Sequence, residues 1–446
     1  MSTVVALSTP RGRGALAVIR LSGPEAIAIA LRMARVDSFE PRRATLTTLK
    51  AGDEVLDQVL VTCFPAPHSL TGEDVVEISC HGSPAIVRRI IDTTLASGAA
   101  LAGPGEFTLR ALSNGKINLA QAEAIRDLIA AQTDAAVKQA ARQLNGELSK
   151  TLDPFKEKLV HVIVLLESAL EFVEDDLPAP QVNQVEEILI SVIAGVDRLS
   201  QSYSAGRLLQ DGAQVAITGR PNVGKSSLFN GLVKSERAIV TEIPGTTRDT
   251  LSEAIDLGGV PVVLTDTAGL RETSDNVESL GIERTHRAMG DADLVLLVLD
   301  GSSQLGPEDE ELLRQTADTR RLVVMNKSDL PSFQPLARCV EDVEAINVSA
   351  RTGEGLSALH SAIVARLNSA GAENGSLLIT NARHYDLLSS AKRELESARV
   401  CFRDRHSEEL VLAPLHNALK FLGQITGETT TEDILSEIFA TFCIGK

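Results

Sequence analysis

A glycine-rich run at residues 219–227, GRPNVGKSS, has the residue types and spacing of a phosphate-binding loop. Its two glycines let the backbone curl, so that consecutive N–H groups and the N-terminus of the next helix point at phosphate oxygens. Lys225 adds a positive charge there, and Ser226 would place its hydroxyl on Mg²⁺. A chance glycine turn is the alternative for this motif taken alone. An apolar, strand-like run at 215–218 precedes the loop and a helical start at 227 follows it, which is the context that the motif requires.

Two further motifs could complete the phosphate end of this site. Residues 266–269, DTAG, follow the apolar run 262–265, where a carboxylate can hold Mg²⁺ through water and a backbone N–H can sense a γ-phosphate. Residues 246–249, TTRD, lie between the phosphate loop and that run. They provide a hydroxyl for Mg²⁺ on a segment that would order only with a triphosphate bound.

The sequence NKSD at 326–329 indicates which base is bound. It follows the apolar run 322–325, and the Asp329 carboxylate can accept hydrogen bonds from both the ring N1–H and the amino group of guanine. Adenine presents a different edge, so this motif selects GTP. Residues 349–351, SAR, would supply backbone that packs on the base.

One position departs from the pattern of many small GTPases. Leu270 follows the DTAG motif, where those proteins keep a glutamine that positions the attacking water. Leucine cannot do that, so another polar group is needed. The acidic segment 275–283 contains Glu278, but from the residues alone Glu278 is one of several solvated acids.

Charge and cysteine usage exclude some classes of protein. The net charge of −17 argues against nucleic-acid binding through a wholly basic surface, although a local basic patch is compatible with it. The five cysteines are odd in number and contain no C-x-x-C pair, which predicts reduced thiols and neither zinc nor a disulfide framework. The N-terminus has no signal-peptide pattern, and no apolar run is long enough to span a membrane. We therefore expect a cytoplasmic protein without a membrane segment.

The pattern of residues changes along the chain, which at 446 residues is too long for one core. Residues 1–117 contain β-rich runs separated by glycine and proline, typical of an α+β domain. From 119 to 205, apolar residues recur three and four apart, as in long amphipathic helices. Residues 212–367 alternate short apolar strands with helical stretches, which predicts a doubly wound parallel sheet with ligand groups at its carboxyl ends. A polar linker at 369–376 precedes further amphipathic helices.

The last helices form too small a core alone, so we expect them to pack against those of 119–205. The predicted fold is therefore multidomain α/β plus all-α, with one domain inserted into another. The predicted domains are the N-terminal α+β domain at 1–117, the first half of a helical domain at 118–211, an inserted Ras-like P-loop G domain at 212–370, and the second half of the helical domain at 371–446.

The motifs GRPNVGKSS, PGTTRD, DTAGLR, NKSD and SART together closely resemble the MnmE (TrmE) family of tRNA-modification GTPases. The C-terminal CIGK and the N-terminal segments LAVIRLSG, TGEDVVE, PGEFT and NGK match that family as well, so the resemblance covers essentially the whole chain. It implies a folate-binding N-terminal domain, a central helical domain and an inserted G domain, arranged as a homodimer. The GTP-binding positions expected from the motifs and the resemblance together are Asn222, Val223, Gly224, Lys225, Ser226, Ser227, Thr241, Glu242, Ile243, Pro244, Gly245, Thr246, Thr247, Asp266, Thr267, Ala268, Gly269, Asn326, Lys327, Asp329, Ser349, Ala350 and Arg351.

The resemblance also implies that the N-terminal domain binds 5-formyl- or 5,10-methylene-tetrahydrofolate. The positions that match the family's contacts are Arg20, Glu77, Lys116 and the C-terminal Lys446. Cations suit the glutamate carboxylates of folate, and a carboxylate suits the donor edge of the pterin. Without the family, Arg20 and Lys116 would be ordinary surface charges.

The same resemblance implies how hydrolysis proceeds without a glutamine. Asn222, Thr241, Ile243 and Thr246 would hold a K⁺ beside the phosphates when two G domains meet, where it does the work of an arginine finger. Glu278 matches the family's water-orienting glutamate. The Mg²⁺ ligands would be Ser226 and Thr247, and the positions that support the switch loops are Arg248, Asp249 and Arg271.

Three positions of this chain differ from the family pattern, and a fourth, Cys443, could take part in the chemistry. Leu70, Ser83 and Asn118 stand near the folate segments, where the family pattern has tyrosine, glycine and aspartate. Cys443 is a candidate nucleophile for the modification, since it follows an amphipathic helix and lies beside the expected folate site. A buried cysteine at a helix end is the alternative for that residue.

The resemblance implies a K⁺-activated GTPase that works with MnmG (GidA), a partner carrying FAD, in a complex of the heterotetramer type. Together they would install a carboxymethylaminomethyl-type group on the wobble uridine of certain tRNAs, with folate as the one-carbon donor. One rival is a ribosome-assembly or RNA-binding GTPase switch without modifying activity, although residues 371–446 contain no G-x-x-G loop of an RNA-binding KH module. A second rival is a folate enzyme of the aminomethyltransferase type with the G domain as its regulator.

Overall fold

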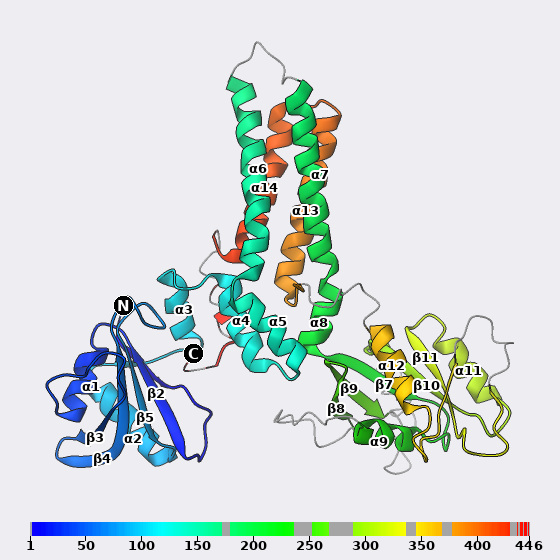
Figure 1. Ribbon diagram of the computed structural model, residues 1–446, viewed down its shortest axis with the longest axis horizontal. Helices are drawn as coiled ribbons and strands as arrows, with labels where there is room; N and C mark the ends of the chain where they lie inside the picture. Colours follow the sequence, from blue (N-terminus) through cyan, green and yellow to red (C-terminus); the bar gives the residue numbers. More distant parts are fainter. Residues whose placement is uncertain are drawn as a thin grey trace, which may run out of the picture. The chain divides into compact units, whose positions relative to one another are not determined.

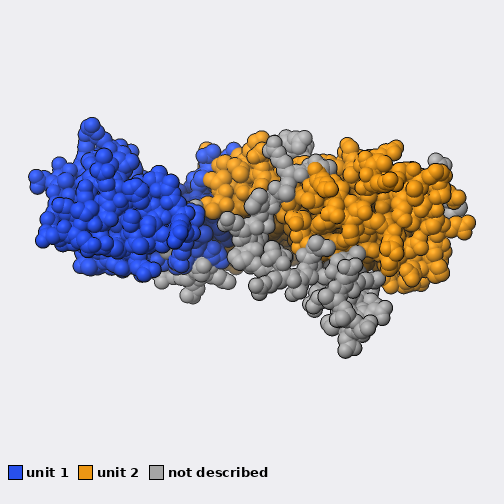
Figure 2. All heavy atoms as spheres, turned by 90° about the horizontal axis from the view of Figure 1, so that it is seen from below, with its two compact units in different colours: residues 1–126, 143–149, 423–446 blue, residues 127–142, 150–422 orange. Residues whose placement is uncertain are grey.

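The computed structural model describes residues 2–171, 179–235, 252–266, 289–335, 345–367 and 377–428, together with 435, 438, 439, 441–443 and 445. Its described residues form two six-stranded sheets, helices that pack on each sheet, and a further group of helices (Figure 1). Contacts divide the chain into two compact units, shown in different colours in Figure 2. Unit 1 contains residues 1–126, 143–149 and 423–446, and unit 2 contains residues 127–142 and 150–422.

The sheet of unit 1 has the strand order β3-β4-β5-β2-β1-β6. Its strands are β1 (Val4–Leu7), β2 (Leu16–Ser22), β3 (Thr45–Ala51), β4 (Glu54–Phe64), β5 (Val75–His81) and β6 (Ala100–Leu101). The pairs are antiparallel except for β1 with β6. Because successive side chains of a strand point to opposite faces, Ile19 and Ile78 enter the core while Arg20 and Glu77 lie on the other face.

Helices α1 (Ala26–Ala34) and α2 (Pro84–Ala96) bury their apolar faces against this sheet. Ile29 of α1 and Ile90 of α2 are fully buried in the same cluster as the β2 and β5 side chains. Burying a side chain of this size stabilises the fold by roughly 1.5–3 kcal/mol. Helix α3 (Glu106–Ser113) follows β6 and directs Phe107 into a small cluster with β1.

The residues near the end of the chain belong to unit 1. Phe439 and Phe442 pack on Ala122 of α4 (Leu119–Ala130), and partly buried apolar side chains of α3 surround them. The carbonyl of Cys443 accepts a hydrogen bond from the Gly105 N–H at 3.3 Å.

A further group of helices comes from two parts of the chain. Its members are α5 (Asp134–Leu144), α6 (Glu147–Glu171), α7 (Ala179–Gln201), α8 (Tyr203–Asp211), α13 (Ala382–Arg403) and α14 (Glu408–Thr426). Helices α13 and α7 lie side by side, joined by ion pairs from Lys392 to Asp197 at 2.8 Å and from Arg399 to Glu186 at 2.8 Å (Figure 1). The helices that follow residue 377 therefore pack on helices that precede residue 211.

The sheet of unit 2 has the strand order β12-β11-β10-β7-β9-β8. Its strands are β7 (Ala213–Thr218), β8 (Ser252–Leu257), β9 (Val260–Asp266), β10 (Leu294–Asp300), β11 (Arg321–Asn326) and β12 (Ala345–Asn347). All neighbouring pairs are parallel except β8 with β9. This order confirms the predicted doubly wound sheet, in which β7 lies at the point where the direction of winding reverses.

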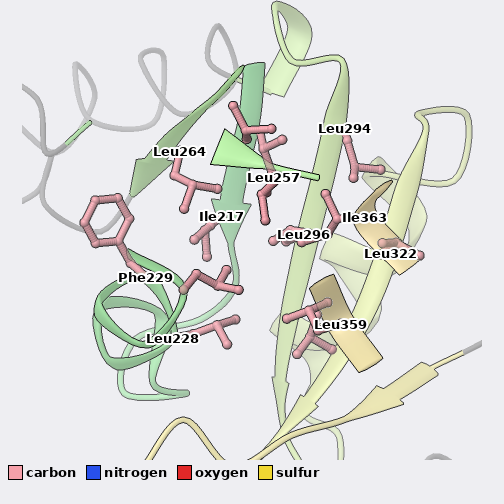
Figure 3. Close-up of a cluster of buried hydrophobic side chains, with 14 of the residues drawn as sticks. Ile217, Leu228, Phe229, Leu257, Leu264, Leu294, Leu296, Leu322, Leu359 and Ile363 are labelled. Carbon is pink, nitrogen blue, oxygen red and sulfur yellow. The ribbon is translucent and has the colours of Figure 1, made fainter. Parts of the chain in front are cut away.

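Helices cover both faces of this second sheet. On one face, Leu296 of β10 packs with side chains of α9 (Lys225–Ser235) and α12 (Leu356–Leu367), as Figure 3 shows for Leu228, Phe229 and Leu359. On the other face, Leu297 and its neighbours on β10 and β11 pack against α11 (Pro307–Gln315). A strand buried on both faces needs apolar residues at every position, which explains the continuous run LVLLVL of β10.

Candidate nucleotide-binding site

The run 219–224 connects β7 to α9 as the sequence predicts, although α9 begins at Lys225, two residues before the expected helical start. Gly219 and Gly224 have φ angles of +153° and +97°. A Cβ atom at Gly219 would collide with the carbonyl oxygen of Val298, and one at Gly224 would collide with the side-chain amide of Asn326. Both positions therefore require glycine, and the first N–H groups of α9 open onto the loop.

Lys225 and Ser226 are the first two residues of α9, and both side chains are held at the loop. The Lys225 ammonium donates to the carbonyl oxygens of Gly219 and Arg220 at 2.9 and 2.8 Å. The Ser226 hydroxyl donates to Oδ2 of Asp266 at 2.7 Å, and Asp266 is fully buried at the end of β9. The structure thus brings together a cation, a hydroxyl and a carboxylate predicted from two motifs that lie 40 residues apart in the sequence.

Asn326 joins the phosphate loop to the loop at 349–351. Its Nδ2 donates to the Val223 carbonyl at 2.8 Å, and its Oδ1 accepts from the Ala350 N–H at 3.0 Å. Asp329 lies beside it, and its Oδ1 accepts the Ser349 hydroxyl at 2.7 Å. The carboxyl ends of β7, β9 and β11 therefore meet in one place with their polar motifs. Figure 3 shows apolar side chains in the core of the same sheet.

Three residues at this end of the sheet were not predicted from sequence, namely Asp300, Arg220 and Asp309. Oδ2 of Asp300 accepts the Lys327 ammonium at 2.7 Å, and Arg220 of the phosphate loop pairs with the buried Asp309 at 3.3 Å. Burial alone would raise the pKa of Asp300, but hydrogen bonds from Lys327 and Ser302 outweigh burial and lower it. Asp300 directly follows an apolar run, and that was the signal by which it could have been found.

In unit 1, Arg20 and Glu77 are partners in the register of β2 and β5. Arg20 donates from Nε and Nη2 to Oε1 of Glu77 at 3.0 and 2.7 Å, and from Nη1 to the Gly445 carbonyl at 3.3 Å. The guanidinium also lies over the Phe107 ring, 5.7 Å from its centroid. Lys116 makes a different contact, since its ammonium donates to the Pro67 carbonyl at 2.9 Å.

A buried network next to this pair was also not predicted. Arg110, whose side chain is 5% exposed, pairs with Glu73 at 2.9 Å and with Glu106 at 2.7 Å. The Ser22 hydroxyl donates to Glu73 at 2.8 Å and lies 2.7 Å from the Thr71 hydroxyl. Burial alone would lower the pKa of Arg110, but its bonds to the two glutamates raise it. The network fixes the segment 71–74 against β2 and α3.

The departures from the family pattern have local explanations at two of three positions. Asn118 caps α4: its Oδ1 accepts the Gln121 N–H at 2.9 Å, while its own N–H donates to Gln121 at 3.0 Å, so asparagine serves the role that aspartate would. Ser83 has an extended backbone at the start of α2, with Pro84 next to it, and needs no glycine there. Leu70 is 49% exposed, and nothing in the structure explains its replacement of a tyrosine.

The thiol of Cys443 is exposed, so the alternative of a buried helix-end cysteine is wrong. Several predicted residues lie outside the described ranges: Thr241, Glu242, Ile243, Pro244, Gly245, Thr246, Thr247, Arg248, Asp249, Thr267, Ala268, Gly269, Arg271, Glu278 and Lys446. Within the described ranges, no helix combines the length and apolar character needed to cross a membrane.

Two family models match the chain over most of its length. The model described as the MnmE helical domain matches residues 119–443, and the one described as the GTP-binding protein TrmE N-terminus matches residues 3–116. Together they take in both units.

Similar proteins are found along the whole chain. It is 44% identical over 451 residues to the tRNA modification GTPase MnmE of Koribacter versatilis, covering 100% of this chain and 99% of that protein. It is 42% identical over 447 residues to the protein of the same name from Aquifex aeolicus, with 99% of each covered. A solved structure, the G domain of the T. maritima FeoB iron transporter, is 29% identical, covers 34% of this chain and 98% of that one, and has a TM-score of 0.28.

Proposed function

The chain belongs to the MnmE family of tRNA modification GTPases, and on that premise we propose that it hydrolyses GTP during modification of the wobble uridine of certain tRNAs. The observation that carries this proposal is the position of Asn326, which hydrogen-bonds both the phosphate loop and the loop at 349–351. Asp329 beside it offers a carboxylate to the N1–H and amino group of guanine. Lys225 and the first N–H groups of α9 would hold the phosphates.

The residues at the end of β9 fit a magnesium ion. Ser226 and Asp266 present a hydroxyl and a carboxylate 2.7 Å apart, and such hard oxygen atoms are the ligands that Mg²⁺ prefers. Ser226 would bind the ion directly together with Thr247, and Asp266 would hold one of its waters. When bound, Mg²⁺ would neutralise the negative charge that develops on the transferred phosphoryl group.

We propose that K⁺ activates hydrolysis and that Glu278 orients the attacking water. Asn222 lies in the phosphate loop with a φ of +65°, a left-handed conformation that asparagine adopts more readily than most residues with a side chain. The cation proposal itself rests on the resemblance to the family. Asn222, Thr241, Ile243 and Thr246 would supply oxygen ligands when two G domains of a homodimer meet. Their cation would neutralise charge that an arginine finger neutralises elsewhere.

Exchanging K⁺ for Na⁺ should lower GTP turnover by at least about tenfold, because removing one stabiliser of the transition state costs that much or more. Glu278→Ala should cause a similar loss of kcat in K⁺ buffer, measured by phosphate release. Glu283→Ala, which removes another acid of the same segment, is the matched control. Unchanged turnover in Na⁺ would contradict the cation role, and wild-type turnover of Glu278→Ala would contradict the glutamate's role.

We further propose that unit 1 binds a tetrahydrofolate that donates a one-carbon unit. Arg20 and Glu77 support this, since they present a cation and a carboxylate on the sheet face opposite the apolar core. Lys116 and Lys446 would contribute further cations for the glutamate tail of folate. Cys443 belongs to the same unit and is exposed, so its thiol is accessible for a role in the modification.

Replacing Arg20 by glutamine should weaken binding of 5-formyl-tetrahydrofolate by roughly tenfold, because a hydrogen bond from a charged donor is lost. Isothermal titration calorimetry gives the Kd and the number of sites, and a thermal melt of the variant distinguishes reversible unfolding from weak binding. Arg88→Gln, on the exposed side of α2, is the control. Equal affinity of Arg20→Gln and wild type would remove Arg20 from the folate site.

The full reaction would need a partner and a defined order of domains. We propose that the chain works as a homodimer with MnmG, which carries FAD, in the cytoplasm where tRNA is present. We also propose the domain division 1–117, 118–211, 212–370 and 371–446. The pairing of α13 with α7 supports it, because α7 precedes the second sheet in the chain and α13 follows it. GTP hydrolysis would then move the inserted G domains and not perform the carbon chemistry.

Nucleoside analysis of tRNA from cells lacking this protein tests the proposal directly. We expect wobble uridines without the carboxymethylaminomethyl-type group, and restoration of the group by the wild-type gene. Unaltered wobble uridines together with a ribosome-assembly defect would favour a GTPase switch of the RNA-binding kind instead.

A further inference from the structure

One segment of unit 2 contacts both loops that would hold the nucleotide. This segment, called the β10 loop here, comprises residues 300–309 and runs from the end of β10 into the first turn of α11. Its first residue, Asp300, lies opposite Asn326 in the register of β10 and β11. Its last residue, Asp309, is 1% exposed. The two acids lie at opposite ends of the loop and have different partners.

Hydrogen bonds from Ser302 fix the Asp300 carboxylate in the orientation in which it pairs with Lys327. Its Oδ1 accepts the N–H and the hydroxyl of Ser302 at 2.9 and 2.6 Å, which leaves Oδ2 for the Lys327 ammonium at 2.7 Å. Lys327 has a φ of +69°, so its backbone is held in a conformation that a residue with a side chain adopts at a cost. The ion pair therefore sets the direction of the one long side chain of the NKSD motif.

The other end of the β10 loop holds the phosphate loop. Nε of Arg220 lies 3.3 Å from Oδ2 of Asp309, and its Nη2 donates to the Ser303 hydroxyl at 2.7 Å. Asp309 also accepts the Gly306 N–H at 3.0 Å, which completes the cap of α11. The Arg220 carbonyl accepts the Lys225 ammonium, so the backbone that Arg220 anchors is the backbone that lines the phosphates.

We propose that Asp300 and Arg220 are positioning residues, through which the β10 loop sets the base-binding and phosphate-binding loops in register with each other. Exposed ion pairs contribute little, but Asp309 is buried, and breaking a buried pair leaves an uncompensated charge. A binding site needs its supporting contacts to hold side chains within about half an ångström of their working positions. The inference rests on the proposed GTP-binding function and adds the residues that support it.

The two positioning residues should have separable effects on nucleotide affinity. Asp300→Asn keeps the shape of the side chain and should raise the Kd of GDP and of GMP by roughly tenfold each, because both ligands carry the base. Arg220→Gln should raise the Kd of GDP by roughly tenfold and leave that of GMP within about twofold, because GMP lacks the outer phosphate. The measurement is fluorescence titration with mant-GDP, followed by competition with unlabelled GDP and GMP.

Controls separate positioning from general damage. Glu310→Gln removes one negative charge from the exposed side of α11 and should leave both Kd values unchanged. An irreversibly misfolded variant lowers the titrated stoichiometry, whereas a reversibly unfolding variant raises the apparent Kd. The stoichiometry and a thermal melt of each variant together remove that ambiguity. At saturating GTP, kcat of Asp300→Asn should stay within about twofold of wild type while KM rises with Kd.

Two results would overturn the inference. If Asp300→Asn raises the Kd by the same factor in a Lys327→Met background as in wild type, Asp300 does not act through Lys327. If Arg220→Gln changes the GDP and GMP affinities equally, Arg220 does not act through the phosphate loop. Failure of the wild-type chain to bind mant-GDP is a different outcome, because it would overturn the proposed function itself.

Discussion

Replacing Asp329 by asparagine should lower the affinity for GTP by roughly a thousandfold and create turnover of XTP. A site built to hydrogen-bond a polar group rejects a ligand that leaves its groups unpaired by such factors. In the proposed site the carboxylate would accept two donors from guanine, whereas asparagine would turn an N–H toward the guanine amino group. Xanthine carries a carbonyl at that position, so its edge matches the asparagine amide.

Steady-state phosphate release with GTP and XTP measures this exchange of specificity. Ser349→Ala is the matched control, because it removes only the hydroxyl that donates to Asp329 at 2.7 Å. That control should weaken GTP binding by about tenfold or less without any gain for XTP. An Asp329→Asn variant that still prefers GTP would show that Asp329 does not read the base.

Alanine at Gly224 should reduce affinity for GDP and GTP by more than about a hundredfold. The φ of +97° strains any residue with a Cβ, and the added atom would displace the Asn326 amide that joins the two loops. Strain and overpacking each cost about 1–3 kcal/mol, and here both act at the contact that joins the two loops. The two loops would then no longer converge on one nucleotide.

Gly98→Ala is the control for backbone strain without a collision. Gly98 has a similar φ of +104°, but a Cβ there meets nothing within 4 Å, and it lies in unit 1. That variant should lose some thermal stability and keep full affinity in mant-GDP titrations. Comparable affinities of Gly224→Ala and wild type would mean that the phosphate loop tolerates a displaced Asn326.

Most of what could be predicted from the sequence came from patterns of residues that are neighbours in the chain. The phosphate loop needs only its own glycines and the strand and helix beside it, and the buried strand β10 needs only its unbroken apolar run. The contact between Lys327 and Asp300 is different, because it depends on two strands lying in one register 27 residues apart. No spacing rule in a single sequence specifies such a register.

The same limit applies in unit 1. Arg20 and Glu77 were expected to serve one ligand, and the register of β2 and β5 does bring them together, 57 residues apart in the chain. The network of Arg110 with Glu73 could not be predicted, because a buried arginine is uncommon and only the fold shows which acids accompany it. Fold class follows from periodicity, whereas pairing of charges follows from tertiary packing.

The residues near the end of the chain impose an order on biosynthesis. Phe439 and Phe442 complete an apolar cluster with Ala122, and Gly445 accepts hydrogen bonds from Ser8 and Arg20. Domains usually fold as they emerge from the ribosome, beginning with the N-terminal one. Here unit 1 lacks the cluster formed by Phe439 and Phe442 until those residues have been translated, which happens after the whole second sheet. The second sheet can therefore assemble on the nascent chain before that cluster closes.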